Sequence, residues 1–274
     1  MFTLIESIED LETLNEELLK KSYVGVDTEF RRTNKANMRL ALLQINDNEE
    51  VYLIDTVLIQ DPKDKISFLF SNSVTKIFHS CKEDLEAIYS WTGKEMVNIF
   101  DTQLANSFIE GDYSISYQNL VENKLDIILE KKETRSNWLR RPLSDSQLKY
   151  AALDVEYLIP LYIDQVKALN QINKLDWHDE DIAKLIEVTF NPNFSTEVTR
   201  TLPKIQEAEL LKRFNKIVNT ISAQQKINPT LFFSKKAQKG FLRLVLIQGL
   251  NEACKEITNW RAGLIKEELL LLLK

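Results

Sequence analysis

The sequence has few residues of the types that build disulfide scaffolds, zinc clusters or histidine sites. Its 274 residues include two cysteines, Cys81 and Cys254, with no CxxC spacing. A disulfide scaffold and a cysteine-rich zinc site are therefore excluded, and a reducing compartment is indicated. Two histidines, His79 and His178, exclude any site that needs a histidine cluster. We interpret His79 as a hydrogen-bonding residue at a strand end, His178 as a surface residue, and both cysteines as inert packing residues.

Long apolar runs are also missing. No segment approaches the ~18 consecutive apolar residues that a membrane-spanning helix needs. The first residues, MFTLIESIEDLE, are acidic where a signal peptide would be basic. We therefore expect a cytoplasmic protein with no membrane partner. A chain of this length can bury a core without disulfides or metals, in one large domain or two modest ones.

The charge is divided unevenly along the chain. Residues 200–274 carry 14 of the 35 basic residues and 6 of the 41 acidic ones, a net charge of +8 that leaves −14 for residues 1–199. One interpretation is a carboxylate-rich catalytic domain beside a domain that holds a polyanion. The alternative is an accidental asymmetry that only keeps the chain soluble.

Short β-type runs alternate with helical runs over the first 125 residues. The Asn46-Asp47-Asn48 cluster predicts a hairpin turn between two of the strands. Hairpin strands followed by β-α units predict an α/β fold with a mixed sheet covered by helices. The expected strands are 23–30, 39–46, 50–56, 76–79 and 98–101, and the expected helices are 8–20, a segment before residue 76, 81–91, 102–110 and 116–124.

The second half of the chain reads as helical. A long helix is predicted from Asp145, with a capping box formed by Ser144 and Gln147, and Pro160 should kink or interrupt it. The polar stretch 191–204 is predicted to be part of a linker. Helices without strands are predicted over 205–222 and 229–274. The predicted organisation is a first domain over 1–175, a linker or helix over 176–203, and a small all-α domain over 204–274.

The run YVGVDTEF ends a buried strand with Asp27 and Glu29. Residues i and i+2 of a strand point to one face, so these two carboxylates project together. Like charges at that distance repel, and a bound cation is the simplest relief. The alternative is a strand end that reaches water with two solvated acids.

Two further carboxylates occur where a site could form. In HSCKEDLE, Ser80 and Glu83 predict a capping box that places Asp84 in the first helical turn after a strand. Asp84 could instead simply favour the helix dipole. In the later helix, Tyr150 and Asp154 share a face at i, i+4 spacing beside an apolar stripe, where an acid needs a partner. A polar boundary position is the alternative.

Together VDTEF, HSCKEDLE and SDSQLKYAALDVEYL resemble the three exonuclease motifs of the DEDD superfamily, in its tyrosine variant. NIFDTQLANSF, YSISYQNLVENKL and KKETRSNWLRRPLS resemble the bacterial ribonuclease D family. The resemblance covers about residues 1–175. It implies an RNase H-like fold that removes nucleotides from RNA 3′ ends, including tRNA precursors and other small RNAs, with two Mg²⁺ or Mn²⁺ ions and no organic cofactor. It also implies metal ligation by Asp27, Glu29, Asp84 and Asp154, and a water-holding role for Tyr150.

Basic and aromatic residues near these motifs could handle the substrate. Guanidinium groups suit phosphates, and Trp138 or Phe30 could stack on a terminal base. For each single cation, a solvated surface position is the alternative. The candidate phosphate-binding residues are Arg31, Arg32, Arg135, Arg140 and Arg141.

The C-terminal stretch resembles the helical HRDC domains that ribonuclease D proteins usually carry. The resemblance rests on AELLKRFNKIVNTISAQQKINPTLFFSKKAQKGFLRL and ITNWRAGLIKEELLLLL. The helical spacing of its apolar residues predicts a core position for Trp260 rather than a base-stacking one. We therefore predict a metal-dependent 3′-5′ exoribonuclease. The alternatives are an exonuclease acting on single-stranded DNA and a non-catalytic RNA-binding protein on the same fold.

Overall fold

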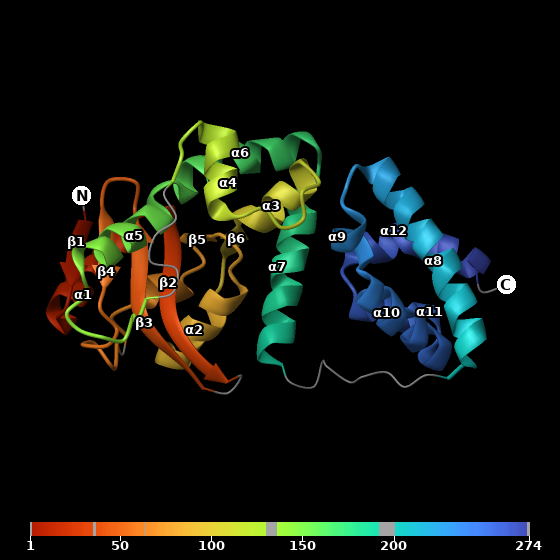
Figure 1. Ribbon diagram of the computed structural model, residues 1–274, viewed down its shortest axis with the longest axis horizontal. Coiled ribbons are helices and arrows are strands. Elements are labelled where there is room, and N and C mark those ends of the chain that lie inside the picture. Colours follow the sequence, from red (N-terminus) through yellow and green to blue (C-terminus); the bar gives the residue numbers. More distant parts are fainter. Residues whose placement is uncertain (1, 35–36, 63, 130–135, 192–200, 273–274) are drawn as a thin grey trace. The chain divides into compact units, whose positions relative to one another are not determined.

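A six-stranded mixed sheet forms the N-terminal part of the protein (Figure 1). The computed structural model describes residues 2–272 except 35–36, 63, 130–135 and 192–200. The strand order is β1-β4-β3-β2-β5-β6, and β2 pairs antiparallel with β3 and parallel with β5. This confirms the predicted mixed sheet. The strands are β1 (Phe2–Ile5), β2 (Tyr23–Asn34), β3 (Asn37–Asn46), β4 (Val51–Ile54), β5 (Thr75–Phe78) and β6 (Ile99–Asp101).

The sheet differs from the sequence prediction in two places. Strand β1 was not predicted, since its four residues form an edge strand that pairs only with β4. The β2–β3 hairpin extends beyond its predicted ends, because Arg31, Arg32 and Asn34 pair with Arg39, Met38 and Asn37 in a stretch that lacks an apolar alternation. The predicted turn is confirmed: Asp47 Oδ1 accepts hydrogen bonds from the amides of Glu49 and Glu50 at 2.9 and 2.8 Å.

Helices follow the predicted order around this sheet. In the described part of the segment before residue 76, a short 3-10 turn, Ser67–Phe70, takes the place of the expected helix. The long helix is interrupted at Tyr157, and Pro160 lies in the first turn of the second piece, where its missing N–H costs no helical hydrogen bond. The helices are α1 (Ile8–Leu18), α2 (Lys82–Thr92), α3 (Thr102–Ile109), α4 (Tyr117–Leu125), α5 (Asp145–Glu156) and α6 (Leu158–Gln171).

Gly25 explains how closely the α5–α6 junction approaches the middle of the sheet. A Cβ at this position would lie 3.2 Å from Leu158 Cβ and from the Val155 carbonyl oxygen, so a larger residue would push the helices away. Asn46 strengthens the contact through Nδ2, which donates to the Val155 carbonyl at 3.0 Å. Alternation along β2 then puts Asp27 and Glu29 on the same face as α5.

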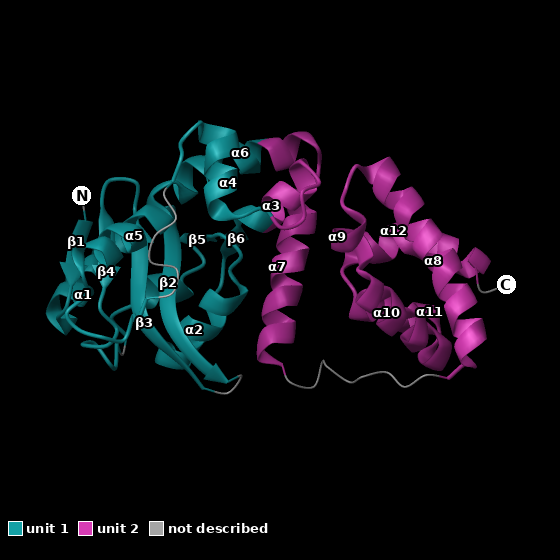
Figure 2. Ribbon diagram, in the orientation of Figure 1, with its two compact units in different colours: residues 1–103, 115–167 teal, residues 104–114, 168–274 magenta. Residues whose placement is uncertain are grey.

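The C-terminal helices form a second unit, which groups residues 104–114 with 168–274 (Figure 2). Its core includes a stack of Trp177 on Trp260, with ring centroids 4.7 Å apart and planes at 9°. Trp260 is 5% exposed, as predicted for a core residue. The helices are α7 (Leu175–Phe190), α8 (Lys204–Gln225), α9 (Pro229–Phe233), α10 (Lys235–Gln248), α11 (Leu250–Ala253) and α12 (Asn259–Leu272).

Part of the predicted linker region is a 16-residue helix, α7. The predicted surface position of His178 is wrong, because this residue is fully buried on the face of α7 that also buries Ile182. Its Nδ1 lies 2.9 Å from Asp179 Oδ1. The domain boundaries at 175 and 204 stay predictions. No helix in the described part of the chain is both long and apolar enough to cross a membrane.

Candidate active site

Strand β2 supplies two of the candidate site's carboxylates. It lies between β3 and β5, and Val24, Gly25 and Val26 are buried before Asp27 is reached. Glu29 pairs with Leu42, and the register with β3 shifts directly after it, between Glu29 and Phe30. Such an irregularity bends a strand and changes where its side chains point. Asp27 and Glu29 therefore lie at the end of the regular part of a central strand.

Helix α5 brings Asp154 and Tyr150 to the same face of the sheet. The predicted capping box is confirmed: Ser144 Oγ accepts from the Gln147 amide at 3.2 Å, and Gln147 Oε1 accepts from the Ser144 amide at 3.0 Å. The Tyr150 and Asp154 side chains interact: Tyr150 opposes the rise in the pKa of Asp154, and Asp154 raises the pKa of Tyr150. The predicted i, i+4 pair is thus an interacting pair on a helix that Gly25 allows close to β2.

Asp84 reaches the site from the first turn of α2, but its helix begins differently from the prediction. The capping box of Ser80 and Glu83 is wrong, because the N-cap is Cys81 and its side chain makes no capping bond. Ser80 has a φ of 66°. The Asp101 carboxylate, at the end of β6, instead accepts from the amides of Ser80 and Cys81 at 3.1 and 2.8 Å. An acid on a neighbouring strand therefore replaces the local cap.

Thr28 is a site residue that the sequence did not indicate. It lies between Asp27 and Glu29, is 6% exposed, and its hydroxyl donates to Asp84 Oδ1. Because alternate residues of a strand face opposite ways, Thr28 meets α2 while its neighbours face α5. Strand β2 thus carries Asp27 and Glu29 on one face, and through Thr28 on its opposite face it holds Asp84 in place.

Electrostatics show that the four carboxylates share one environment. Desolvation raises the pKa of Glu29 to about 9, with further contributions from Asp154 and Asp84. Desolvation, then repulsion by Asp84, Asp154 and Glu29, holds the pKa of Asp27 well above its usual range. Burial also raises the pKa values of Asp84 and Asp154 to about 7, although hydrogen bonds from Thr28 and Tyr150 oppose this. None of the main causes of these four shifts is a basic side chain among the described residues.

The same field acts on Tyr150. Desolvation and repulsion by Asp154, Glu29 and Asp27 raise the pKa of its hydroxyl, so Tyr150 stays protonated at neutral pH. Its ring lies 6.2 Å from that of Trp138, centroid to centroid. Because Trp138 is only 5% exposed, it supports Tyr150 as a packing residue in this structure.

This arrangement fits divalent cations chemically. Carboxylate oxygens are the ligands that Mg²⁺ and Mn²⁺ prefer, and a dication would relieve the repulsion that raises these pKa values. Among the described residues, however, no three His, Cys, Asp or Glu side chains lie close enough together to hold a metal ion. The carboxylates are therefore electrostatic neighbours that do not form a ready-made coordination shell.

A profile of 3′-5′ exonuclease domains matches residues 2–169. The chain belongs to this exonuclease family. Ribonuclease D of Pseudomonas paraeruginosa is 40% identical over 164 residues, which cover 60% of this chain and 43% of that protein. The chain spans about half or less of the length of the ribonuclease D sequences that it matches.

Solved structures confirm the predicted fold class. Escherichia coli RNase D, an exoribonuclease involved in structured RNA processing, gives a TM-score of 0.67 at 22% identity over 99% of this chain and 74% of that chain. Brucella melitensis NrnC with bound Mg²⁺ gives a TM-score of 0.60 at 22% identity over 74% of this chain and 98% of that chain. The HRDC-like character of the C-terminal helices stays a prediction.

Two of the predicted phosphate-binding residues of this exonuclease domain already have carboxylate partners. Arg141 donates to both oxygens of buried Asp55, with Nη2 2.7 Å from Oδ1, and to the Ala41 carbonyl at 2.8 Å. Arg32 pairs with Glu86. The structure therefore gives Arg141 a structural contact that links residues after Trp138 to the sheet.

The other predicted contacts of the exonuclease domain remain open. Arg31 and Arg140 are exposed, and Phe30 is half-buried. Arg135 lies outside the described residues. Binding of phosphate or a base by these residues stays a prediction.

His79 and the two cysteines behave as expected for residues without a catalytic role. His79 lies between Thr102 Oγ1, 2.9 Å from Nδ1, and the Ile115 carbonyl, 3.0 Å from Nε2, as predicted for a strand-end hydrogen-bonding residue. Burial lowers its pKa, so its ring is neutral near pH 7. Burial raises the pKa values of the Cys81 and Cys254 thiols, which disfavours the nucleophilic thiolate.

Proposed function

We propose that this chain is a metal-dependent 3′-5′ exoribonuclease of the ribonuclease D type, which acts on tRNA precursors and other small RNAs. The observation that carries the proposal is the meeting of four carboxylates from β2, α2 and α5 with no basic partner among the described residues. Membership of the 3′-5′ exonuclease family and the identity to ribonuclease D sequences support this reading.

Asp27, Glu29, Asp84 and Asp154 are the residues that would hold two divalent cations. Bound there, Mg²⁺ or Mn²⁺ would supply an acidified water and neutralise charge on the phosphate and the leaving oxygen. The likeness to NrnC with bound Mg²⁺ supports a hard divalent ion. All three of the other carboxylates raise the pKa of Asp27, so this side chain would be strongly stabilised by a bound cation.

Tyr150 would position the attacking water. With its proton directed toward Asp154, with which it interacts, the lone pairs of its oxygen would be free to accept a hydrogen bond from that water. Since its pKa is raised, the phenol does not remove the water's proton. Asp154 would thus orient the Tyr150 hydroxyl and also contribute a ligand oxygen.

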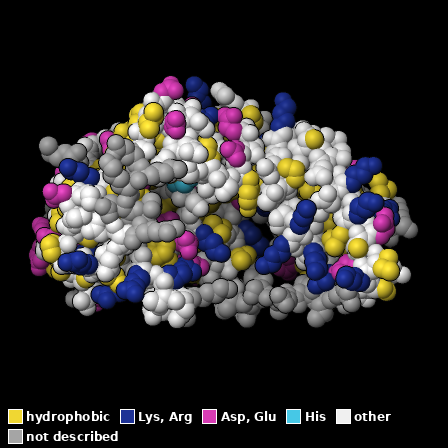
Figure 3. All heavy atoms as spheres, viewed as in Figure 1, with side chains coloured by type: hydrophobic (Ala, Val, Ile, Leu, Met, Phe, Trp, Pro, Cys, Tyr) yellow, Lys and Arg dark blue, Asp and Glu magenta, His cyan; other side chains and the backbone are white. Residues whose placement is uncertain are grey.

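RNA is the proposed partner, and two basic surfaces would contact it. Arg31 and Arg140 are exposed in the N-terminal unit. Lys and Arg side chains also gather over the C-terminal helices on the face shown in Figure 3. Exposed cations that neutralise phosphates give binding that does not depend on sequence. We propose that the C-terminal helices hold parts of the RNA beyond its 3′ end.

The test is digestion of 5′-end-labelled single-stranded RNA and DNA with Mg²⁺, with Mn²⁺ and with EDTA. A ladder that shortens from the 3′ end on RNA, and disappears in EDTA, is expected. A ladder on DNA alone would identify a DNA exonuclease. Binding of RNA without cleavage in either metal would identify a non-catalytic protein on the same fold.

A further inference from the structure

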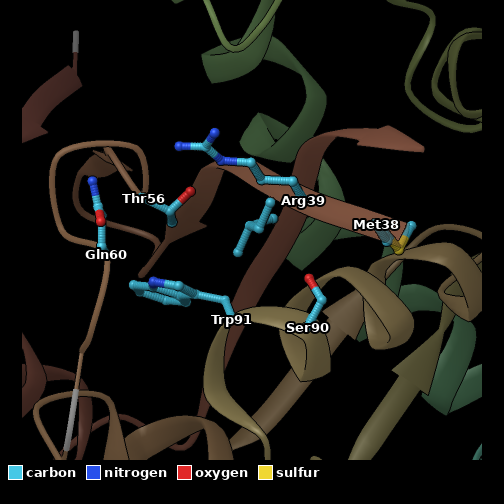
Figure 4. A pocket seen from close by; sticks show the side chains of 7 residues that line it. Met38, Arg39, Thr56, Gln60, Ser90 and Trp91 are labelled. Carbon is cyan, nitrogen blue, oxygen red and sulfur yellow. The ribbon is translucent and has the colours of Figure 1, made fainter. Parts of the chain in front are cut away.

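A surface cavity, separate from the four carboxylates, lies near the C-terminal end of helix α2 (Figure 4). It has a volume of about 370 Å³, and small-molecule sites span about 300–1,000 Å³. Three elements line it: β3, the loop after β4, and the end of α2. The lining includes Arg39, Leu40, Thr56, Gln60, Ser90 and Trp91.

Thr56 places a buried hydroxyl without a hydrogen-bond partner in the wall of the cavity. It is 4% exposed, and its buried Oγ1 has no hydrogen-bond partner among the described residues. The loop around it is fixed, because Asp55 Oδ1 accepts from the amides of Val57 and Leu58 at 3.0 and 3.1 Å and also binds Arg141. Buried polar groups are normally hydrogen-bonded, so this unpaired hydroxyl indicates a ligand that supplies the missing hydrogen bond.

Trp91 and Leu40 give the cavity an apolar wall. The Trp91 indole is held by its Nε1, which donates to the Ile59 carbonyl at 2.8 Å. Its ring therefore has a fixed orientation and offers carbon surface to the hollow. A flat aromatic ring gains contact area and stacking against such a wall at little entropic cost.

Arg39 and Gln60 give the cavity its polar rim. Both are exposed, and the Arg39 guanidinium forms no ion pair with any residue in the described ranges. A free guanidinium binds phosphate, and a carboxamide offers both a donor and an acceptor. The matching ligand has a flat ring, a polar edge and a negative charge, which together describe a nucleotide.

We propose that this cavity binds one nucleotide unit, with its base against Trp91, a polar group on Thr56 Oγ1 and its phosphate near Arg39. The choice of a nucleotide rests on the proposed function. Two sources are possible: a free 5′-mononucleotide, which is the product of the reaction, or a nucleotide upstream in the bound RNA. Trp91 is seven residues from Asp84 on α2, about 10 Å along the helix. This distance is the length of about three stacked nucleotides, so an RNA chain could reach from the carboxylates to the cavity.

The first experiment titrates 5′-AMP into the metal-free protein in EDTA and measures binding by calorimetry. Thr56→Val and Arg39→Ala are the test variants. Lys94→Ala is the matched control, because it removes an equal charge just beyond α2, from an exposed lysine paired with Asp64. We expect Thr56→Val to weaken binding about three- to tenfold and Arg39→Ala about tenfold, with Lys94→Ala unchanged. Thr56→Val should keep the wild-type melting temperature, because its hydroxyl has no protein partner to lose.

The second experiment distinguishes the two sources. RNAs of two and six nucleotides are bound to Asp154→Asn protein in Mg²⁺, with and without each pocket substitution. Weaker binding of the hexamer but not the dimer assigns the cavity to an upstream nucleotide, and an effect on 5′-AMP alone assigns it to the free product. The proposal is overturned if both pocket variants bind 5′-AMP and the hexamer like the parent protein. Absence of RNA hydrolysis by the wild type, with these pocket effects intact, would overturn the proposed function alone.

Discussion

Neutralising Asp84 should stabilise the metal-free protein at alkaline pH. Burial raises the pKa of this carboxyl from 3.8 to about 7. A raised carboxyl pKa means that folding favours the protonated form. Its contribution to stability is therefore complete below about pH 4 and is lost as the pH rises through about 7. Asp84→Asn keeps an oxygen that can accept the Thr28 hydroxyl but carries no charge to desolvate.

The size of the effect follows from that shift. About three pKa units at 1.36 kcal/mol each set an upper limit of about 4 kcal/mol above pH 7. Relaxation and water entry reduce the cost of a buried charge, so we expect a gain of about 1–3 kcal/mol. For a chain of this size, this is a rise of roughly 2–8 °C in melting temperature.

The assay is thermal unfolding in EDTA at pH 4.5 and pH 8, followed by circular dichroism. Asp84→Asn should melt higher than wild type at pH 8 and within about 1 °C of it at pH 4.5. Asp164→Asn, at an exposed position on α6, is the control and should change neither. Millimolar Mn²⁺ should raise the melting temperature of wild type more than that of Asp84→Asn. An equal or lower melting temperature for Asp84→Asn at pH 8 would refute the picture of an uncompensated buried carboxylate.

Three further substitutions test other contacts. Thr28→Val should weaken Mn²⁺ binding about 10- to 100-fold in a calorimetric titration, and Thr28→Ser should restore it, because the hydroxyl orients Asp84; equal affinities would contradict this role. Arg141→Ala should lower the free energy of unfolding by about 3–5 kcal/mol in urea, since it leaves Asp55 buried without its partner, and a loss below about 1 kcal/mol would argue against a structural role. Neutralising three exposed lysines on α10 should flatten the dependence of log K on log[salt] for single-stranded RNA by up to about 2, at about 0.7 per phosphate contact; an unchanged slope would remove these lysines from the RNA-binding surface. They are Lys235, Lys236 and Lys239.

Local periodicity was enough to predict the parts of the site that lie within one element. A two-residue period places Asp27 with Glu29, and a four-residue spacing places Tyr150 against Asp154. The Ser144 capping box is equally local, since both of its partners lie within four residues. Each of these features depends only on the geometry of a single strand or helix.

Contacts between distant segments could not be predicted in this way. Asp84 is held by Thr28 across 56 residues, and Arg141 is engaged by Asp55 across 86. Asp101 replaces the expected cap on α2 from a neighbouring strand. From the sequence, His178 was predicted to lie at the surface, but this residue lies on the buried face of α7 in the C-terminal unit. In each case the partner is set by sheet order and helix packing, which a motif does not encode.

The single-turnover rate of Asp154→Asn on end-labelled single-stranded RNA at saturating Mn²⁺, compared with wild type and Asp164→Asn, directly tests whether the carboxylates form the catalytic metal site. Asp154 would supply a ligand oxygen and would also orient the Tyr150 hydroxyl, with which it interacts. Losing both roles should remove several kcal/mol of transition-state stabilisation, so we expect the rate to fall at least about a thousandfold. Asp164→Asn should cleave at the wild-type rate. Cleavage by folded Asp154→Asn within about tenfold of wild type would contradict the assignment of these carboxylates as the catalytic metal site.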